Sequence, residues 1–142
     1  MSYLVNRRHI TAEWGHCDPT GVVFNSRFFE YFDICSWLLF EAALGVRPCD
    51  LAATFDIIGI PLVGAQARYL MPARFGDVIE ILSSIKEFRR SSFDVEHRLL
   101  IGGALAVEGN ETRVWAGVDK DDPSRMRARP IPPEVIERFK AP

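Results

Sequence analysis

The chain has 142 residues, 48% of them apolar, and a formal net charge of −2. This length and composition fit one domain with a sizeable core, and the balanced charge excludes a global attraction to nucleic acid. No stretch approaches the ~18 apolar residues of a membrane span, and charges appear by position 7 with no apolar leader, so we expect a cytoplasmic protein that does not bind membranes.

The first elements in chain order are a strand and a long helix. Residues from Asn6 to Trp14 alternate between polar and apolar, which is the period of a half-buried strand. From about Ser26 to Leu44 the period becomes helical, and Gly45 is placed to cap the helix. The apolar stripe of this helix needs a broad sheet face to cover it. It consists of Phe28, Phe32, Cys35, Leu39, Ala42 and Ala43.

The second half of the chain is typical of strands, being rich in β-branched residues and punctuated by glycines. We expect strands over 62–70, 78–88, 93–99, 104–108 and 112–118, turns at 102–103 and 109–110, and a short helix over 133–140 behind several prolines.

This order of elements predicts an α+β fold of the hotdog type, in which an antiparallel sheet, arranged as a meander, wraps around one long central helix. We expect residues 1–142 to form a single domain of this type. The exposed edges of such a sheet predict pairing with at least one further copy of the chain.

The segment HCDPTGVVFN, residues 16–25, contains the strongest catalytic candidate. Asp18 is followed by apolar residues that lead into the helix, so its carboxylate is expected beside apolar walls. The nearby helix N-terminus offers free amides and a positive dipole end, which stabilise an oxyanion. Asp18 could therefore act as nucleophile or general base while an N–H near Asn25 polarises a carbonyl. A plain turn is the alternative, because type I turns favour Asp followed by Pro.

Cys17 is the competing nucleophile. In an extended chain the adjacent His16 would point away from it, so the thiol lacks an obvious base. The three cysteines have no metal-ligand spacing and are expected to be free thiols. His9 and His97 are interpreted as ordinary strand residues. We predict no metal and no cofactor.

Two further groups of polar residues are candidates for substrate contacts. Asp33 lies in mid-helix with Phe29 and Trp37 one turn away on either side, so it is either the polar end of an aromatic pocket or a solvated acid. Arg89 and Arg90 lie at a predicted turn beside two serines, which is either a phosphate site or a plain charged turn. Together with an acyl-transfer site, the arginine pair indicates coenzyme A.

Several stretches together resemble the 4-hydroxybenzoyl-CoA thioesterase family of hotdog enzymes. The resemblance extends over most of the chain, and the stretches at 15–24 and 85–93 are the specific ones. Ser91 stands where the best-known member of the family has a third basic residue. The stretches are GHCDPTGVVF at 15–24, FD at 32–33, GIP at 59–61, GD at 76–77 and IKEFRRSSF at 85–93.

The resemblance implies an acyl-CoA thioesterase whose substrate is an aromatic thioester, 4-hydroxybenzoyl-CoA. Asp18 would attack the thioester carbonyl or activate water, and the amide of Asn25 would polarise that carbonyl. Asp33 would accept a hydrogen bond from the para-hydroxyl group, and Arg89 and Arg90 would bind the CoA phosphates. Family subunits form dimers and then tetramers with sites at the dimer interface, so the resemblance implies a homodimer or homotetramer.

Two alternatives stay open. One is a hotdog thioesterase for short aliphatic acyl-CoA, because relatives acting on such esters share the aspartate motif and only Asp33 argues for a hydroxylated ring. The other is a non-catalytic module that binds acyl-CoA.

Overall fold

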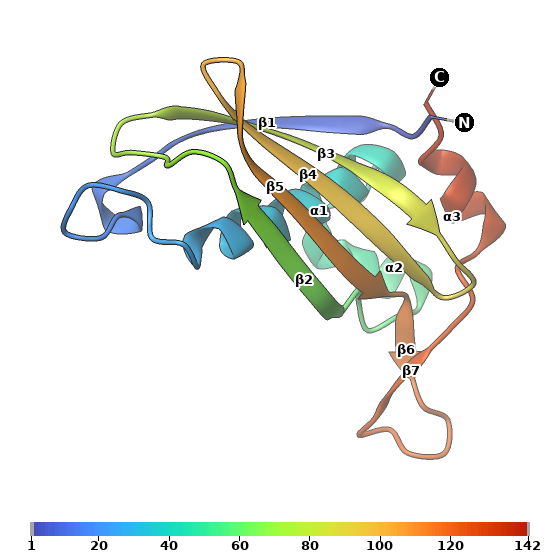
Figure 1. Cartoon of the computed structure of the whole chain (residues 1–142). Coiled ribbons are helices and arrows are strands. Elements are labelled where there is room, and N and C mark those ends of the chain that lie inside the picture. Colours follow the sequence, from blue (N-terminus) through green and yellow to red (C-terminus); the bar gives the residue numbers. More distant parts are fainter. Residues whose placement is uncertain (1, 142) are drawn as a thin grey trace.

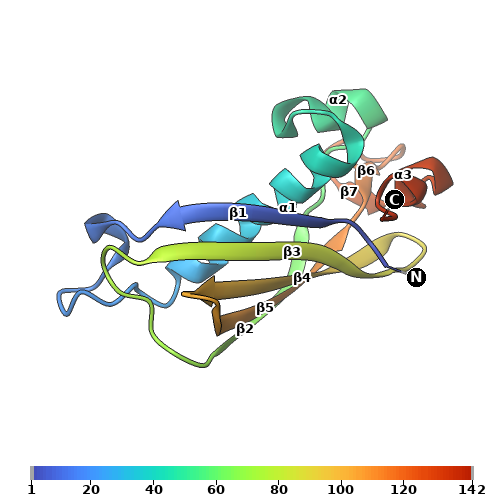
Figure 2. The ribbon, with the colours of Figure 1, turned by 90° about the horizontal axis from the view of Figure 1, so that it is seen from above.

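A five-stranded antiparallel sheet lies against a long helix, α1, which runs along one of its faces (Figures 1 and 2). The structure is a computed structural model and describes residues 2–141. The order across the sheet is β1-β3-β4-β5-β2, and a two-stranded hairpin, β6-β7, extends beyond the end of β5 (Figure 1). The elements are β1 (Val5–Thr11), η1 (Trp14–His16), α1 (Arg27–Leu44), η2 (Pro48–Asp50), α2 (Leu51–Phe55), β2 (Leu62–Tyr69), β3 (Val78–Phe88), β4 (Ser92–Ile101), β5 (Ala104–Val114), β6 (Ala116–Val118), β7 (Met126–Ala128) and α3 (Pro133–Arg138).

The core lies between this sheet and α1, and the predicted α+β class is confirmed. In β4 the inward residues Phe93, Val95, His97 and Leu99 are fully buried, and the residues that alternate with them are more exposed. Gly45 ends α1 in the left-handed conformation, at φ 69°, and its N–H bonds to the Glu41 carbonyl, as its position predicts.

The predicted apolar stripe of α1 is buried except at Ala42, which is exposed. The sheet wraps around a wider face of the helix than the stripe alone, so Tyr31, Ser36 and Phe40 are also buried. The buried Ser36 is a polar residue in this interface and has polar partners in the sheet, which are described below.

The first strand is shorter than predicted. It ends at Thr11, because the chain turns into the 3-10 helix η1 instead of continuing to Trp14. Ala12 is buried and donates its N–H to the Asp77 carbonyl, whereas the Trp14 ring lies on the surface against Phe75. Alternation in the sequence therefore extends past the end of the paired strand.

The sheet is a meander only from β3 to β5. Strand β2 does not neighbour β3, because it pairs with β5 at the opposite edge from β1. The connection after β2 crosses the end of the sheet, where the Leu70 N–H bonds to the Ala106 carbonyl. As a result, β2 has one free edge.

The turn predicted at Gly109-Asn110 is wrong, since β5 continues through both residues and ends at Val114. Gly109 is needed there for space: a Cβ atom would lie within 2.4 Å of the Phe32 ring. That ring stacks on His97, with centroids 4.8 Å apart, and His97 is opposite Gly109 in the β4-β5 ladder. The turn at Gly102-Gly103 is confirmed, with φ of 58° and 81°.

The two ends of the described segment meet, since the Ala141 N–H bonds to the Ser2 carbonyl at 3.1 Å (Figures 1 and 2). The predicted C-terminal helix forms as α3, and the Leu4 N–H bonds to the carbonyl of Phe139, which follows it. The Phe139 ring packs on Phe40 of α1 at 4.7 Å. Within residues 2–141, no helix is both long enough and apolar enough to cross a bilayer.

Candidate active site

The loop before α1 folds back on itself and holds Asp18 at a tight turn. The Asp18 carbonyl accepts the Gly21 N–H at 2.9 Å, and the Asp18 N–H bonds to the Val22 carbonyl. Gly21 has φ 81°, a conformation that glycine adopts without strain. The plain turn considered from the sequence therefore exists, and it also fixes the position of the carboxylate.

Only one oxygen of the Asp18 carboxylate is occupied within the described chain. Oδ1 accepts hydrogen bonds from the Thr20 backbone N–H, at 2.8 Å, and from the Thr20 hydroxyl. These bonds hold the pKa of the Asp18 carboxyl below its usual value. Oδ2 accepts no hydrogen bond from residues 2–141, so an ionised oxygen is available to a substrate or water.

The start of α1 leaves a backbone donor free. The N–H of Asn25 bonds to no group among residues 2–141, and the helix begins two residues later. The Asn25 carbonyl accepts a hydrogen bond from the Tyr69 hydroxyl at 3.0 Å, and the Tyr69 ring contacts Phe28 edge-on. Tyr69 thus links the end of β2 to the peptide that precedes the helix.

An apolar cavity of about 320 Å³ lies beside this peptide. Val22, the backbone partner of Asp18, contributes to its wall, whereas Asp18 itself does not line the cavity. Asn25 and Tyr69 bring the polar groups to a lining that is otherwise apolar. The lining residues are Val22, Val23, Asn25, Phe28, Tyr69, Leu70, Met71, Pro72 and Ala73.

Cys17 lacks a histidine base in this structure. Its thiol contacts the Glu13 carbonyl at 3.5 Å. The neighbouring His16 instead uses Nδ1 for the Tyr31 hydroxyl, at 2.9 Å, and for the Glu13 N–H. Burial raises the pKa of Tyr31 to about 12. Among residues 2–141, no cluster of three or more His, Cys, Asp and Glu side chains is arranged to hold a metal ion.

Asp33 is not a simple solvated acid, although half of its side chain is exposed. Its Oδ1 accepts a hydrogen bond from Nη2 of Arg113, on β5, at 2.6 Å. The Arg113 side chain is 2% exposed, so this ion pair joins the helix surface to the interior of the sheet. Oδ2 of Asp33 accepts no hydrogen bond within the described part of the chain.

Behind Asp33 lies a buried polar network that we call the His97–Arg113 network, made of Ser36, Ser83, His97, Glu111 and Arg113. Glu111 is its centre: Oε1 contacts His97 Nε2 at 3.0 Å and accepts a hydrogen bond from the Ser36 hydroxyl. Arg113 donates to Oε1 through Nε and to Oε2 through Nη2. The Ser83 hydroxyl contacts Nδ1 of His97 at 2.7 Å. Each of the five polar side chains of this network therefore has a partner.

The electrostatics of the network favour its charged form. Burial raises the pKa of Glu111, but the hydrogen bonds and charges of His97 and Arg113 outweigh burial and hold it at about 2. For Arg113, burial lowers the pKa, and its two carboxylate partners outweigh that effect and raise it. A carboxylate and a guanidinium thus lie between the sheet and the helix.

This network was not predicted from the sequence, although the sequence contains a signal for it. Glu111 and Arg113 occupy inward positions of β5, two and four residues after the close-packed Gly109. A charged pair at inward positions of a strand requires buried partners. His97, interpreted as an ordinary strand residue, is fully buried and is one of those partners.

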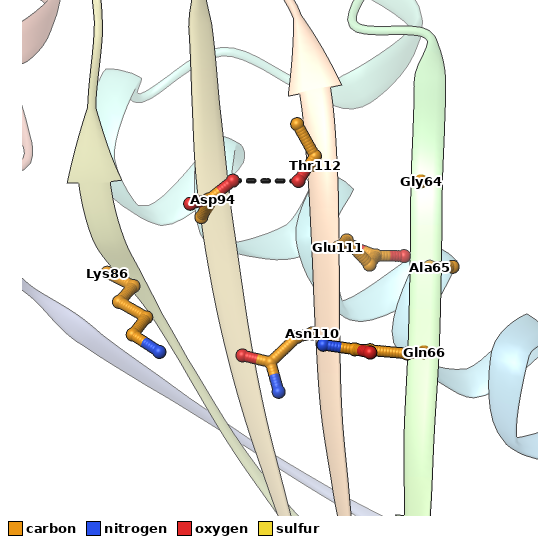
Figure 3. Close-up of a pocket in the computed structure, with 8 residues that line it drawn as sticks. All are labelled: Gly64, Ala65, Gln66, Lys86, Asp94, Asn110, Glu111 and Thr112. Carbon is orange, nitrogen blue, oxygen red and sulfur yellow. Dashed lines mark hydrogen bonds between the residues drawn. The ribbon is translucent and has the colours of Figure 1, made fainter.

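Arg89 and Arg90 occupy the β3-β4 turn, as predicted, but their surroundings differ. Arg89 donates two hydrogen bonds to Asp94, at 2.8 and 2.9 Å, and one to Glu87. Asp94 also accepts a hydrogen bond from Thr112, in a polar depression of about 410 Å³ over β2 to β5 (Figure 3). The Arg89 charge is therefore already compensated.

Arg90 is exposed and makes no side-chain hydrogen bond or ion pair among residues 2–141. It lines a cavity of about 560 Å³ with Lys120, Arg127 and Arg129, which come from the β6-β7 hairpin and the residues after it. Asp121 is the one acidic side chain in that lining. The lining is therefore mainly basic, and the β6-β7 hairpin lies at the opposite end of the sheet from the β4-β5 turn (Figure 1).

Comparison with known proteins identifies the family. The model of the thioesterase-like superfamily matches residues 12–139. The chain belongs to this superfamily. It is 34% identical over 131 residues to the 4-hydroxybenzoyl-CoA thioesterase of Pseudomonas sp. (strain CBS-3), covering 88% of this chain and 90% of the relative.

Solved thioesterases also share the fold. The structure of the Pseudomonas enzyme superposes with a TM-score of 0.83 at 30% identity, over 94% of this chain and 98% of that one. An aspartate-to-asparagine mutant of a 4-hydroxybenzoyl-CoA thioesterase, complexed with 4-hydroxybenzoyl-CoA, gives 0.85 at 30% identity over 96% and 99%. A gentisyl-coenzyme A thioesterase gives 0.78 at 29% identity over 92% and 99%. The predicted hotdog fold is confirmed, and this thioesterase is a thioester hydrolase that acts on acyl-CoA.

Proposed function

We propose that this thioesterase hydrolyses an aromatic acyl-CoA with a para-hydroxyl group, 4-hydroxybenzoyl-CoA, to the free acid and CoA. The observation that carries the proposal is the pair of free groups on the loop before α1. They are an oxygen of Asp18 and the N–H of Asn25, and Asn25 lines an apolar cavity. A relative that is 34% identical carries the name of this activity.

Asp18 acts as nucleophile or general base in this proposal. Its lowered pKa keeps the carboxylate ionised at neutral pH. Thr20 bonds to Oδ1, so Oδ2 stays free to attack the thioester carbonyl or to activate water. The Asn25 N–H would donate to the developing oxyanion, an interaction worth about 2.7–4 kcal/mol in comparable sites. A thiolate leaves without strong acid assistance, so these two groups suffice for the chemistry.

Asp33 recognises the ring hydroxyl and the arginines recognise CoA. The half-exposed Asp33 has an open acceptor oxygen, which a phenolic O–H can use. Arg90, in its basic cavity, would bind the phosphates, and we expect a smaller contribution from Arg89 because carboxylates already hold it. The basic residues of that cavity would compensate for Ser91, where the family's best-known member has a further cation.

We also propose that the protein works as a homodimer or as a homotetramer made of two dimers. Strand β2 is a sheet edge whose residues are exposed on both faces, and exposed apolar side chains continue past its end. An unpaired edge of this kind favours strand pairing with a second copy. Light scattering at several protein concentrations would measure the molar mass and so detect a dimer or a tetramer. The exposed apolar residues are Leu62, Val63, Tyr69, Leu70 and Met71.

The test is thiol release from 4-hydroxybenzoyl-CoA, benzoyl-CoA and butyryl-CoA by the wild type, Asp18→Asn and Asp33→Ala. We expect turnover of the first ester, its near-complete loss in Asp18→Asn, and loss of the preference for the hydroxylated ring in Asp33→Ala. Asp56→Asn is the matched control, because Asp56 is fully exposed and its φ of 52° suits asparagine. Near wild-type turnover by a folded Asp18→Asn protein would contradict the role of Asp18.

The same preparation distinguishes the alternatives. Faster hydrolysis of butyryl-CoA than of either aromatic ester, unaffected by Asp33→Ala, would identify the short aliphatic thioesterase. Repeated turnover in heavy-oxygen water separates the two roles of Asp18, because direct attack would leave label in the enzyme carboxylate.

A further inference from the structure

We propose that Arg113 is a positioning residue for substrate recognition: held by the His97–Arg113 network, it fixes the Asp33 carboxylate so that one oxygen faces the ring hydroxyl. The inference rests on the proposed function, since it assumes that Asp33 contacts the acyl group. Arg113 itself is buried and would not contact the substrate.

The geometry of the Arg113 guanidinium is fully specified by its partners. Nε and Nη2 donate to the two oxygens of Glu111, and Nη1 donates to the Ile60 carbonyl at 3.0 Å. The shortest contact, 2.6 Å, is the one from Nη2 to Oδ1 of Asp33. A planar guanidinium with its donors engaged in this way cannot rotate without breaking several hydrogen bonds. It therefore holds Oδ1 of Asp33 at a fixed place and leaves Oδ2 free.

The network also fixes the position of Glu111, the carboxylate that holds Arg113. Glu111 is held by His97 from β4 and by Ser36 from α1, and His97 is held in turn by Ser83 from β3. The Phe32 ring covers His97 by stacking on it. Three strands and the helix that carries Asp33 thus determine where the guanidinium lies.

Stability alone is a weak reason for such a network. Replacing a buried ion pair by apolar residues of similar size is often neutral or stabilising, because desolvation offsets the attraction. Here the buried charges end at a half-exposed carboxylate on α1, the residue for which a substrate role was predicted independently. A buried network that terminates at a candidate recognition group is typical of groups that orient a binding residue.

The test uses Arg113→Lys. Lysine keeps the positive charge beside Glu111, but it lacks the fork that reaches Glu111, Ile60 and Asp33 together. The readout is the ratio of kcat/KM for 4-hydroxybenzoyl-CoA to that for benzoyl-CoA, which lacks the hydroxyl. Arg98→Lys is the matched control, because Arg98 is an exposed arginine of the same sheet, next to His97 in β4.

We expect the ratio to fall about tenfold in Arg113→Lys, which is the effect of disordering one hydrogen bond to the substrate, and to stay at the wild-type value in Arg98→Lys. In an Asp33→Ala background, Arg113→Lys should cause no further fall in the ratio. Equal losses for both esters, or an unchanged ratio in a folded Arg113→Lys protein, would overturn the proposal, because a purely structural role affects both substrates alike.

A second variant covers the case in which Arg113→Lys does not fold. The double replacement Glu111→Gln/Arg113→Gln removes both buried charges together and leaves neither one uncompensated. It should show the same tenfold fall in the ratio, and retention of the wild-type ratio would overturn the proposal. A wild-type enzyme that hydrolyses neither ester overturns the proposed function as well, whereas discrimination that is intact in every variant overturns only the role of Arg113.

Discussion

Replacing Glu111 with glutamine should change how the stability of the protein depends on pH. The folded protein holds the pKa of Glu111 at about 2, against 4.5 for an unperturbed glutamate. At about 1.4 kcal/mol for each pH unit, this difference stabilises the folded state by about 3 kcal/mol at neutral pH. Because the folded pKa is depressed, the contribution is complete above pH 4.5 and is lost as the pH falls toward 2.

The assay is urea unfolding of the wild type and Glu111→Gln between pH 7 and pH 3, at one protein concentration because assembly would also stabilise the fold. The wild type should be more stable by about 3 kcal/mol at pH 7 and by only about 1 kcal/mol at pH 3. Glu96→Gln is the control, since Glu96 precedes His97 in β4 but points to the other face of the sheet. A constant difference between the two proteins over this pH range would refute the charged state assigned to Glu111.

Three other predictions concern the loop, the turn and the helix contact. Arg90→Gln should raise KM for CoA esters several-fold with little change in melting temperature. Arg89→Gln should lower the melting temperature and should raise KM less than Arg90→Gln does. Gly109→Ala should destabilise the fold by about 1–3 kcal/mol in urea unfolding, because its methyl group would collide with the Phe32 ring. Tyr69→Phe removes the hydroxyl that holds the peptide before α1 and should lower kcat more than it changes KM, measured on the ester that the wild type hydrolyses fastest.

The sequence predicted those parts of the fold that local pattern determines. The long helix, its glycine cap and strand β3 agree with their predicted limits because periodicity and capping are local properties. Gly109-Asn110 has the same local signature as a turn, and the strand continues there because both residues pair with β4 and β2, which is a long-range property. The edge position of β2 is likewise a matter of long-range pairing.

The candidate site shows the same division. Asp18 and Asn25 lie on one short loop, so their proximity to the helix start could be inferred from spacing. Asp33 had two interpretations because its partner, Arg113, is eighty positions away in the sequence. The β4-β5 pairing and the packing of α1 bring these residues together, and neither is visible in a local window.

The contact between Phe32 and Gly109 also fixes where α1 lies along the sheet. The ring fits where the strand has no Cβ atom, and sliding the helix by one turn, about 5.4 Å, would press it against a residue that has one. The next residue, Asp33, would at the same time leave Arg113, and the peptide at Asn25 would leave Tyr69. The lack of a side chain at Gly109 therefore helps to set the position of both Asp33 and Asn25, and substitutions at this glycine should alter specificity and turnover together.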